Sequence, residues 1–505
     1  MKKRLVIYFH YDKNGRADDA CLFMLRAIAA EAARVLFVTN GALTPESAAA
    51  VAGAGAELRE RENVGLDAGA YKETLLALGQ TGLAEYDELV MMNYTLAGPV
   101  SPLRTMFDAM DVRQELDFWG ITRHYAMKSS RFKTGYGGVP EHIQSHFIAV
   151  RATLFNKPEF WTYWQELPPP KSYEQSVALH EARFTRWFAD KGFQWDTYLN
   201  TDDLKNVFVN PVMACPAELI EHRGCPVFKR RSLFTPYADE LRRTAGEAAG
   251  ALYRCLTARS YPVDGLVHSL LPGQPLTALA KNLHWELTLS PCGEAGDTPA
   301  VVLLQTGTAR ELAGLVSSRP GQLLCLIKPR QGGVPDAAAW YADRAAESLY
   351  KNEGLLRAAA RAFAQDPLLG LVSPAMPPFA PLYEERLACW RQALPALRKA
   401  MERYSIALPL EDSEPLPVPF ADCVLVRLDA LGGVLPPLDT PEGWWLLPLL
   451  AQKNGWISKT VCTPEQAQAN GAVLSTLLYE NQKPRAAAKN LGRAVKHTLK
   501  RRLGR

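Results

Sequence analysis

The stretch RLVIYFHYDKNGRADDACLFMLRAIAAEAARVLFVTNG (residues 4–41) decides the fold class. Its two apolar runs, LVIYF and VLFV, have the length of buried strands, and the alanine-rich segment between them has the composition of a helix. A strand, a helix and a second strand in this order form a βαβ unit, whose two strands lie parallel in one sheet. The sequence therefore predicts an α/β domain built on a parallel sheet.

Polar residues stand where the predicted strands end. Asp12 and Asn40 follow the first two apolar runs, and Asn93 ends a third run, DELVMMNYT, just before a Gly-Pro turn. Open α/β sheets bind their ligands at the carboxyl ends of the strands. On topology alone, we expect these three residues at a binding site.

The chain is long enough for two domains. Its 505 residues exceed what one hydrophobic core usually organises. The segment SPCGEAGDTPA (residues 290–300) is rich in turn-forming residues, and the apolar runs VVLLQ, LLCLI, LLGLV and CVLVR follow it. We expect a first α/β domain over residues 1–270, a linker over 271–299, a smaller α/β domain over 300–465, and a basic tail over 480–505.

Composition narrows the class of protein without naming an activity. The content of 48% hydrophobic and 22% charged residues is that of an ordinary globular protein. The nine cysteines are odd in number and form no C-x-x-C pair, so neither a zinc site nor a disulfide framework is expected. The start MKKRLVIYFHYD is too short in apolar residues for a signal peptide, and no run approaches the roughly 20 apolar residues that span a bilayer. These features favour a cytoplasmic location.

The last residues of the chain are strongly basic. After Glu480, the last acidic residue, come nine of the 57 basic residues and none of the 53 acidic ones. Leu491, Val495 and Leu499 fall on one face of a helix with basic residues around them, a pattern typical of helices that lie on anionic membranes. A frayed basic terminus is the alternative. Nucleic acid is not the expected partner, because the tail has no aromatic residue to stack on bases.

The segment RENVGLDAGAYK (residues 61–72) carries the most informative spacing. Gly65 and Gly69 allow the backbone to approach a ligand closely, Asn63 and Asp67 can bond a ribose or a base, and Lys72 can meet a phosphate. From the residues alone, a loop leading into a helix is an equally good interpretation.

The spacing of this segment resembles the N-x-G-x-D-x-G-A-Y-K signature of the rhamnan synthesis F family, and other segments resemble that family in the same order. They are IYFHYD (residues 7–12), VTN (38–40), NYTLAGPV (93–100), DFWGIT (117–122), HIQSHFIAVR (142–151), HEARFTRWFADKGF (180–193) and GCPVFKRRSLF (224–234). The resemblance is strong over residues 1–240 and weaker beyond them, where it rests on PLLGLVSP (367–374) and PFADCVLVRLDAL (419–431).

The resemblance implies a GT-A-like nucleotide-sugar transferase as the first domain. The residues implied to bind the donor are Asp12, Asn40, Asn63, Gly65, Asp67, Gly69, Lys72 and Asn93. GT-A-like enzymes commonly place a carboxylate after a buried strand, where a divalent cation can neutralise the donor diphosphate. Here that position reads Asn93-Tyr94-Thr95, so the metal ligands stay unknown and a requirement for Mg²⁺ or Mn²⁺ is left open.

The segment HEARFTRWFADKGF also resembles the E-D-x-x-x-x-x-R-x-x-x-x-G helix of inverting GT-A transferases. The alignment places Glu181 where a carboxylate removes the proton of the acceptor hydroxyl. An exposed helical glutamate is the alternative interpretation.

Two further groups of residues are candidates for the site. His142, Gln144 and Ser145 precede the apolar run FIAV and are expected to line the sugar or acceptor pocket, although a histidine at a strand edge is equally common. Lys229 and Arg230 are expected to hold a diphosphate, and a solvated basic turn is the alternative.

These expectations combine into one function. The resemblance implies an inverting transferase of rhamnan, O-antigen or capsule assembly, peripheral on the inner face of the membrane. It would move L-rhamnose from a dTDP-activated donor to a lipid-linked glycan. A non-catalytic glycan-binding or scaffolding protein of the same pathway is the alternative, because Tyr94 stands where a carboxylate is usual. In the second domain, Leu326-Ile327-Lys328 replaces a His-Asp-Lys element of the family, so no second active site is expected there.

Overall fold

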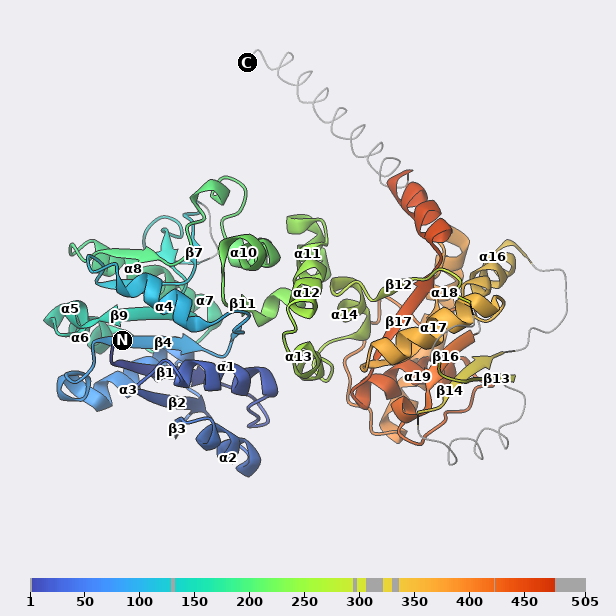
Figure 1. The fold of residues 1–505 in the computed structure, drawn as a ribbon, viewed down its shortest axis with the longest axis horizontal. Helices are drawn as coiled ribbons and strands as arrows, with labels where there is room; N and C mark the ends of the chain where they lie inside the picture. The colour runs from blue at the N-terminus through green and yellow to red at the C-terminus, as the bar shows by residue number, and fades with distance from the viewer. Residues whose placement is uncertain are drawn as a thin grey trace, which may run out of the picture. The chain divides into compact units, whose positions relative to one another are not determined.

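The computed structural model describes residues 2–128, 132–293, 298–305, 321–328, 336–421 and 423–476 (Figure 1). Contacts divide the chain into two compact units, Met1–Ser269 and Leu270–Arg505, and each unit contains its own β-sheet. Both are therefore α/β, which confirms the expected fold class. The predicted basic tail over residues 480–505 lies outside the described residues.

A seven-stranded mixed sheet forms the centre of the first unit, in the order β10-β6-β9-β4-β1-β2-β3. Its strands are β1 (Arg4–His10), β2 (Arg34–Asn40), β3 (Glu57–Arg61), β4 (Glu88–Asn93), β6 (Phe118–Gly120), β9 (Phe147–Arg151) and β10 (Trp195–Thr197). β1 pairs in parallel with both β2 and β4, which confirms the βαβ opening. Strand β9 alone runs antiparallel, between β4 and β6.

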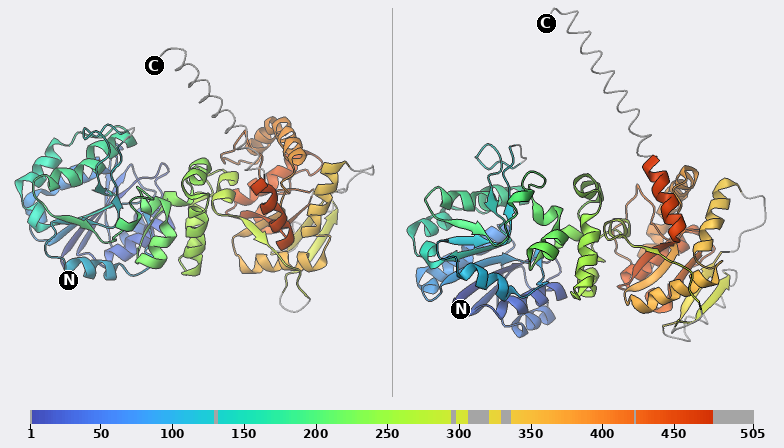
Figure 2. Two further views of the ribbon diagram at one scale, coloured as in Figure 1. Left: turned by 90° about the horizontal axis from the view of Figure 1, so that it is seen from above. Right: turned by 45° about the horizontal axis from the view of Figure 1, so that its top comes forward.

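Helices flank this sheet on both sides (Figure 2). They include α1 (Asp19–Ala29), α2 (Pro45–Gly53), α3 (Leu66–Leu83), α4 (Leu103–Asp111), α5 (Ala152–Phe155), α6 (Pro158–Glu166), α7 (Tyr173–Ser176) and α8 (Ala182–Ala189). Successive side chains of a strand point to opposite faces, so β1 packs into both layers. Phe9 contacts Tyr71 of α3 on one face, whereas the Tyr8 hydroxyl contacts Cys21 of α1 on the other.

Several short elements complete the first unit. Two small antiparallel pairs join β5 (Leu96–Ala97) to β11 (Phe228–Lys229) and β7 (Arg123–His124) to β8 (His142–Ile143). A π-helical turn, η1 (Val177–Glu181), precedes α8. The remaining elements are η2 (Asp202–Leu204), α9 (Pro211–Ala214), α10 (Pro216–Arg223), η3 (Arg230–Leu233), α11 (Tyr237–Thr244), α12 (Ala248–Ala258) and α13 (Val263–Leu270).

A buried ion pair fixes neighbouring strands at the centre of the first sheet. The Arg4 side chain is fully buried, and its Nε donates to Glu88 Oε2 at 2.8 Å. The indole Nε1 of Trp119 donates to the other oxygen of Glu88 at 2.9 Å. A buried charge is tolerated only when it is paired and hydrogen-bonded, so these three residues hold β1, β4 and β6 in one arrangement.

The second unit has a six-stranded sheet in the order β12-β17-β15-β16-β14-β13. Its strands are β12 (Glu286–Thr288), β13 (Val301–Gln305), β14 (Leu323–Ile327), β15 (Leu369–Pro374), β16 (Cys423–Arg427) and β17 (Ile457–Cys462). Its helices are α14 (Leu276–Asn282), α16 (Ala337–Ala345), η4 (Ala346–Ser348), α17 (Glu353–Gln365), α18 (Ala380–Arg403), η5 (Leu428–Leu431) and α19 (Pro441–Lys453).

The region expected to be a linker, residues 271–299, contains regular structure. Helix α14 lies in it, and β12 pairs in parallel with β17 as an edge strand of the second sheet. The turn-rich composition of residues 290–300 does not predict strand β12, which comes before that segment. β12 forms because it pairs with β17, and this pairing depends on a distant part of the chain. Among the described residues, no helix has the length and apolar character that crossing a bilayer requires.

Candidate active site

The carboxyl ends of β1, β2 and β4 lie beside the start of helix α3, and two predicted site residues contact each other there. Asn93 Nδ2 donates to Asp67 Oδ2 at 3.0 Å, and Ser176 Oγ donates to Asp67 Oδ1 at 3.1 Å. Asn93 is 5% exposed, whereas Asp67 is half-buried. Two candidate residues that lie 26 positions apart in the sequence are thus brought together. Ser176 is a partner that the sequence did not indicate.

A second polar pair lies at the end of β2. Asn40 Nδ2 donates to Asn63 Oδ1 at 3.1 Å, while Arg61 donates to Asn40 Oδ1 and to the Val64 carbonyl. The Arg61 guanidinium also bonds Glu73 of α3 at 2.7 Å. These contacts hold the loop between β3 and α3 over the strand end, and Asn63 is exposed at its rim.

The backbone around Gly65 and Gly69, the two glycines of the RENVGLDAGAYK segment, leaves no room for a larger residue. Gly65 has a φ of +77°, and it precedes the first turn of α3. A Cβ on Gly69 would lie 2.8 Å from the Val64 carbonyl oxygen, closer than real contacts allow. Larger residues at either position would push the loop off the helix. The glycines thus shape the loop that carries Asn63 and Asp67.

Lys72 and Asp12, both predicted to bind the donor, form hydrogen bonds with backbone groups in this structure. Lys72 Nζ donates to the carbonyls of Gln165 and Leu167 at 2.8 and 2.7 Å, at the end of α6, where a positive charge is stabilising. Asp12 Oδ1 accepts the amides of the turn after β1, from Asn14 at 2.8 Å and a second residue at 3.1 Å. Lys72 therefore acts as a helix cap, which its spacing in the motif did not reveal.

The Glu181 carboxylate is held by two predicted pocket residues. Ser145 Oγ donates to Glu181 Oε2 at 2.6 Å, and His142 Nε2 lies 3.5 Å from Glu181 Oε1. The Glu181 side chain is 19% exposed, so the alternative of an exposed helical glutamate does not hold. Glu181 ends the π-helical turn η1, and such turns often occur at functional sites.

The electrostatics of the site favour an ionised Glu181. Burial alone would raise its pKa, but the hydrogen bond and charge of His142, the charge of Lys229 and the Ser145 hydroxyl hold the pKa of Glu181 well below its usual range. Burial lowers the pKa of Lys229, while the charges of Glu181 and Asp67 raise it. Lys229 therefore lies within electrostatic range of both carboxylates.

Arg230 differs from its neighbour Lys229. Its guanidinium bonds the Asp18 carboxylate at the start of α1, and it donates to Ser269 Oγ at 3.0 Å. Its charge is therefore matched within the fold. That Arg230 holds a diphosphate stays a prediction; in this structure its guanidinium is paired with Asp18, a partner 212 residues away that the sequence could not show.

Two neutral histidines complete the wall beside Glu181. Burial lowers the pKa of His146 well below its usual value, and burial followed by the charge of His142 lowers the pKa of His124 to about 4. The Thr122 hydroxyl donates to Gln144 Oε1 at 2.8 Å and lies 3.2 Å from His146 Nε2. Sequence reasoning missed His124 and Thr122, whose only signal was their place in the DFWGIT segment and the strand after it.

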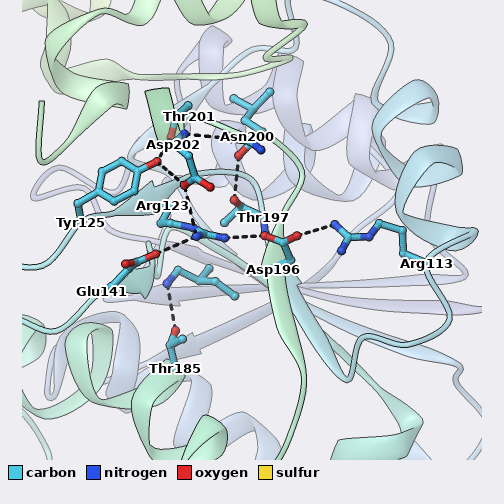
Figure 3. A network of polar contacts seen from close by, with 12 residues as sticks. Arg113, Arg123, Tyr125, Glu141, Thr185, Asp196, Thr197, Asn200, Thr201 and Asp202 are labelled. Carbon is cyan, nitrogen blue, oxygen red and sulfur yellow. Dashed lines mark hydrogen bonds and ion pairs between the residues drawn. The ribbon is translucent and has the colours of Figure 1, made fainter. Parts of the chain in front are cut away.

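A network of polar contacts fixes the β7–β8 pair that carries His142 (Figure 3). Arg123 donates to Glu141 at 2.8 Å and to Asp196 at 2.6 Å, and Arg113 donates to the other oxygen of Asp196 at 2.7 Å. These contacts join the short strand pair to β10. They determine where His142 stands relative to Glu181.

Residues 35–280 match the family model of rhamnan synthesis protein F. The resemblance drawn from the sequence motifs is thereby confirmed over this range. The chain is also 25% identical over 153 residues to the uncharacterized protein y4gN of Sinorhizobium fredii (strain NBRC 101917 / NGR234), covering 30% of this chain. It spans about 37% of the length of that relative.

Solved structures show a distant likeness. Glucosyl-3-phosphoglycerate synthase from Mycobacterium tuberculosis, in complex with Mn²⁺, UDP-glucose and phosphoglyceric acid, is 12% identical with a TM-score of 0.26, over 45% of this chain and 81% of that one. Core-mannan synthase A from Aspergillus fumigatus is 9% identical with a TM-score of 0.24, over 38% and 72%. Likeness at these scores identifies neither a substrate nor a reaction.

The residues at the end of β4 do not fit a divalent cation. Tyr94 packs on Phe9 and His10, with ring centroids 6.1 and 5.4 Å apart, and Asn93 Oδ1 already accepts the Thr95 amide at 3.2 Å. In the described part of the chain, no group of three or more His, Cys, Asp or Glu residues could hold a metal ion.

Proposed function

We propose that the first unit is an inverting GT-A-like glycosyltransferase of surface-polysaccharide assembly, with Glu181 as its general base. The observation that carries this proposal is the partly buried Glu181 carboxylate, which accepts from Ser145 and faces His142, and whose pKa is held below its usual range. It shares the Lys229 charge with Asp67, which lies at the strand ends where α/β proteins bind ligands. The match to rhamnan synthesis protein F supports a polysaccharide as product.

The reaction follows from the residues in place. The acceptor hydroxyl replaces Ser145 as the donor to Glu181 and loses its proton to that carboxylate as its oxygen attacks the anomeric carbon. The bond from that carbon to the diphosphate oxygen breaks in the same step, and the anomeric configuration inverts. Lys229 offsets the charge that develops on the departing diphosphate.

The donor side of the site has the chemistry to hold a nucleotide. Asp67 can accept from the ribose hydroxyls, and Asn40 and Asn63 form an amide pair at the end of β2. The sugar is proposed to be L-rhamnose, in keeping with the family description, and its carrier is proposed to be dTDP. The acceptor is proposed to be a lipid-linked glycan at an anionic membrane.

Turnover of nucleotide-sugar by the purified chain tests this function. Release of nucleotide is followed for dTDP-rhamnose, other dTDP-sugars, UDP-sugars and GDP-sugars, each with and without Mn²⁺ and with EDTA. The proposal expects release from one donor that rises when an acceptor glycan is added. Release from none of them would leave the second candidate, a non-catalytic glycan-binding protein, which Tyr94 at the end of β4 favours.

A further inference from the structure

The second sheet repeats the strand arrangement of the first. In chain order, strands β13, β14, β15, β16 and β17 take the spatial order β13-β14-β16-β15-β17, as β1, β4, β6, β9 and β10 take β1-β4-β9-β6-β10. In both sets only the fourth strand, β16 or β9, runs antiparallel to its neighbours. The first and last pairs are parallel in both.

An arginine at the end of the antiparallel strand makes the same contacts in both units. Arg151 ends β9, and its Nη2 donates to the carbonyl of Met110, near the end of helix α4, at 2.5 Å. Arg427 ends β16, and its Nη2 donates to the carbonyl of Phe363, near the end of helix α17, at 2.6 Å. Each helix directly precedes the strand that pairs with the arginine's own strand. The strand register therefore corresponds residue by residue.

This register places Lys328 where the first unit has Asn93. The first residue of β9 lies opposite Met92, and the first residue of β16 lies opposite Ile327. The residues that follow, Asn93 and Lys328, therefore leave their strands at corresponding points. Both stand at the carboxyl end of the strand beside the antiparallel one.

The residues before the antiparallel strand correspond in the same way. Gln144 and Ser145 lie three and two residues before β9, and Phe420 and Ala421 lie three and two residues before β16. In the first unit these positions hold an amide and the hydroxyl that bonds Glu181. In the second unit they hold a phenyl ring and a methyl group.

The helices before the last strands, α8 before β10 and α19 before β17, also correspond. Before β10 and β17 the chain turns at Gly192 and Gly455, whose φ angles are +92° and +87°. Both glycine amides donate to the carbonyl three residues earlier, at 2.9 and 3.1 Å. Counting eleven residues back from each glycine gives Glu181 and Trp444.

The four residues of the second unit line one cavity. Its volume is about 390 Å³, within the range of small-molecule sites, and Lys328, Phe420, Ala421 and Trp444 all face it. Charged residues of α18 and the α16 cap, Glu385, Arg386 and Asp336, lie at its wall beside Trp445. The cavity is thus the counterpart of the Glu181 site, with aromatic rings in place of the polar groups.

Among the described residues, the counterpart cavity has neither a carboxylate at the position of Glu181 nor the strands and helix that carry the proposed donor residues of the first site. Trp444 cannot accept a proton. In the first unit, residues 11–87 between β1 and β4 carry β2, β3 and α3 with the proposed donor residues, whereas only residues 306–322 separate β13 from β14. The described sheet ends at β13. The second unit therefore corresponds only to the acceptor side of the site in the first unit.

We infer that the cavity of the second unit binds a pyranose unit of the glycan acceptor without acting on it. This inference rests on the proposed function of the first unit for the identity of the glycan. Pyranose rings present apolar C–H faces that pack on aromatic rings, and their hydroxyls bond charged side chains. Phe420 and Trp444, which are 7% and 6% exposed, offer only the ring edges that reach the cavity for the first kind of contact, and Lys328 and Glu385 supply the second.

Calorimetry on the full chain tests the inference with short oligosaccharides of rhamnose, glucose and N-acetylglucosamine as probes. Ala339→Trp fills the cavity from α16, and Lys328→Ala removes one charged contact. Each is expected to weaken saccharide binding about tenfold or more, the effect of one lost charged hydrogen bond. Glu385→Ala should weaken it as well, while Glu384→Ala, an exposed neighbour outside the cavity wall, should not.

Two controls separate this inference from the function of the first unit. Glu181→Gln should lose turnover but keep the saccharide binding that Ala339→Trp weakens, and that result supports the cavity even if no donor is ever turned over. If dTDP or UDP binds the wild-type chain in competition with the saccharide and Ala339→Trp removes that nucleotide binding, the cavity is a nucleotide site and the inference is wrong. Wild-type binding to none of the probes, or undiminished binding by Ala339→Trp, would also overturn it.

Discussion

Replacing Glu181 by glutamine tests the proposed base most directly. Glutamine keeps the size of the side chain, and its carbonyl oxygen can still accept from Ser145 Oγ, which now donates at 2.6 Å. The variant cannot take a proton from an acceptor hydroxyl. Losing a positioned general base costs about 10²- to 10⁴-fold in rate, or about 3–5 kcal/mol in the barrier.

The effect of Glu181→Gln on stability should be much smaller. A hydrogen bond to a charged group contributes about 1.5–3 kcal/mol and a neutral one about 0.5–1.5, so the bond to Ser145 weakens by about 1 kcal/mol. Because folding lowers the pKa of Glu181 below its ordinary value of 4.5, its ionised form stabilises the fold above that value. The difference in stability between Glu181→Gln and the wild type should therefore be present at pH 7. It should disappear as the pH falls below 4.5 and through the lowered pKa of Glu181 in the folded state.

The assays are nucleotide release with acceptor present and calorimetry with the nucleotide alone. Glu181→Gln should lose turnover and keep nucleotide affinity, because the donor contacts at Asp67 and Asn93 are unchanged. Glu174→Gln, an exposed glutamate of α7, is the matched control and should behave as wild type. If Glu181→Gln transfers sugar at the wild-type rate, the carboxylate is structural and the proposed mechanism is wrong.

Three further outcomes are expected. Asp67→Ala should abolish nucleotide binding in calorimetry while leaving the melting temperature within a few degrees; full affinity in the variant would remove Asp67 from the donor site. Lys72→Met should lower the free energy of unfolding by about 1 kcal/mol, the contribution of its helix-capping hydrogen bonds, and leave nucleotide affinity unchanged. A loss of nucleotide affinity without a loss of stability would instead show that Lys72 binds a phosphate. Truncation after Glu480 should reduce binding to anionic liposomes, most at low salt, and equal binding by both chains would argue against a membrane-anchoring tail.

Part of the candidate site could be predicted because strand ends converge in an α/β sheet. The strand-end argument selected Asn93 and the spacing of the RENVGLDAGAYK segment selected Asp67, and the structure joins the two at 3.0 Å. The motif spacing did not reveal which side chains were already engaged. Lys72 caps α6 and Arg230 pairs with Asp18, and both partners are distant in sequence.

The sequence by itself determined the α/β class of both units, the βαβ opening and the family resemblance, since periodicity and motif order are local properties. Only the tertiary structure decided which polar groups surround Glu181, because His142, Ser145 and Lys229 reach it from other elements. The correspondence between the two sheets was hidden for the same reason. Strand order and register are set by pairing between distant segments. Three of the four polar residues that would have marked the repeat, Gln144, Ser145 and Glu181, are replaced in the second unit by apolar ones.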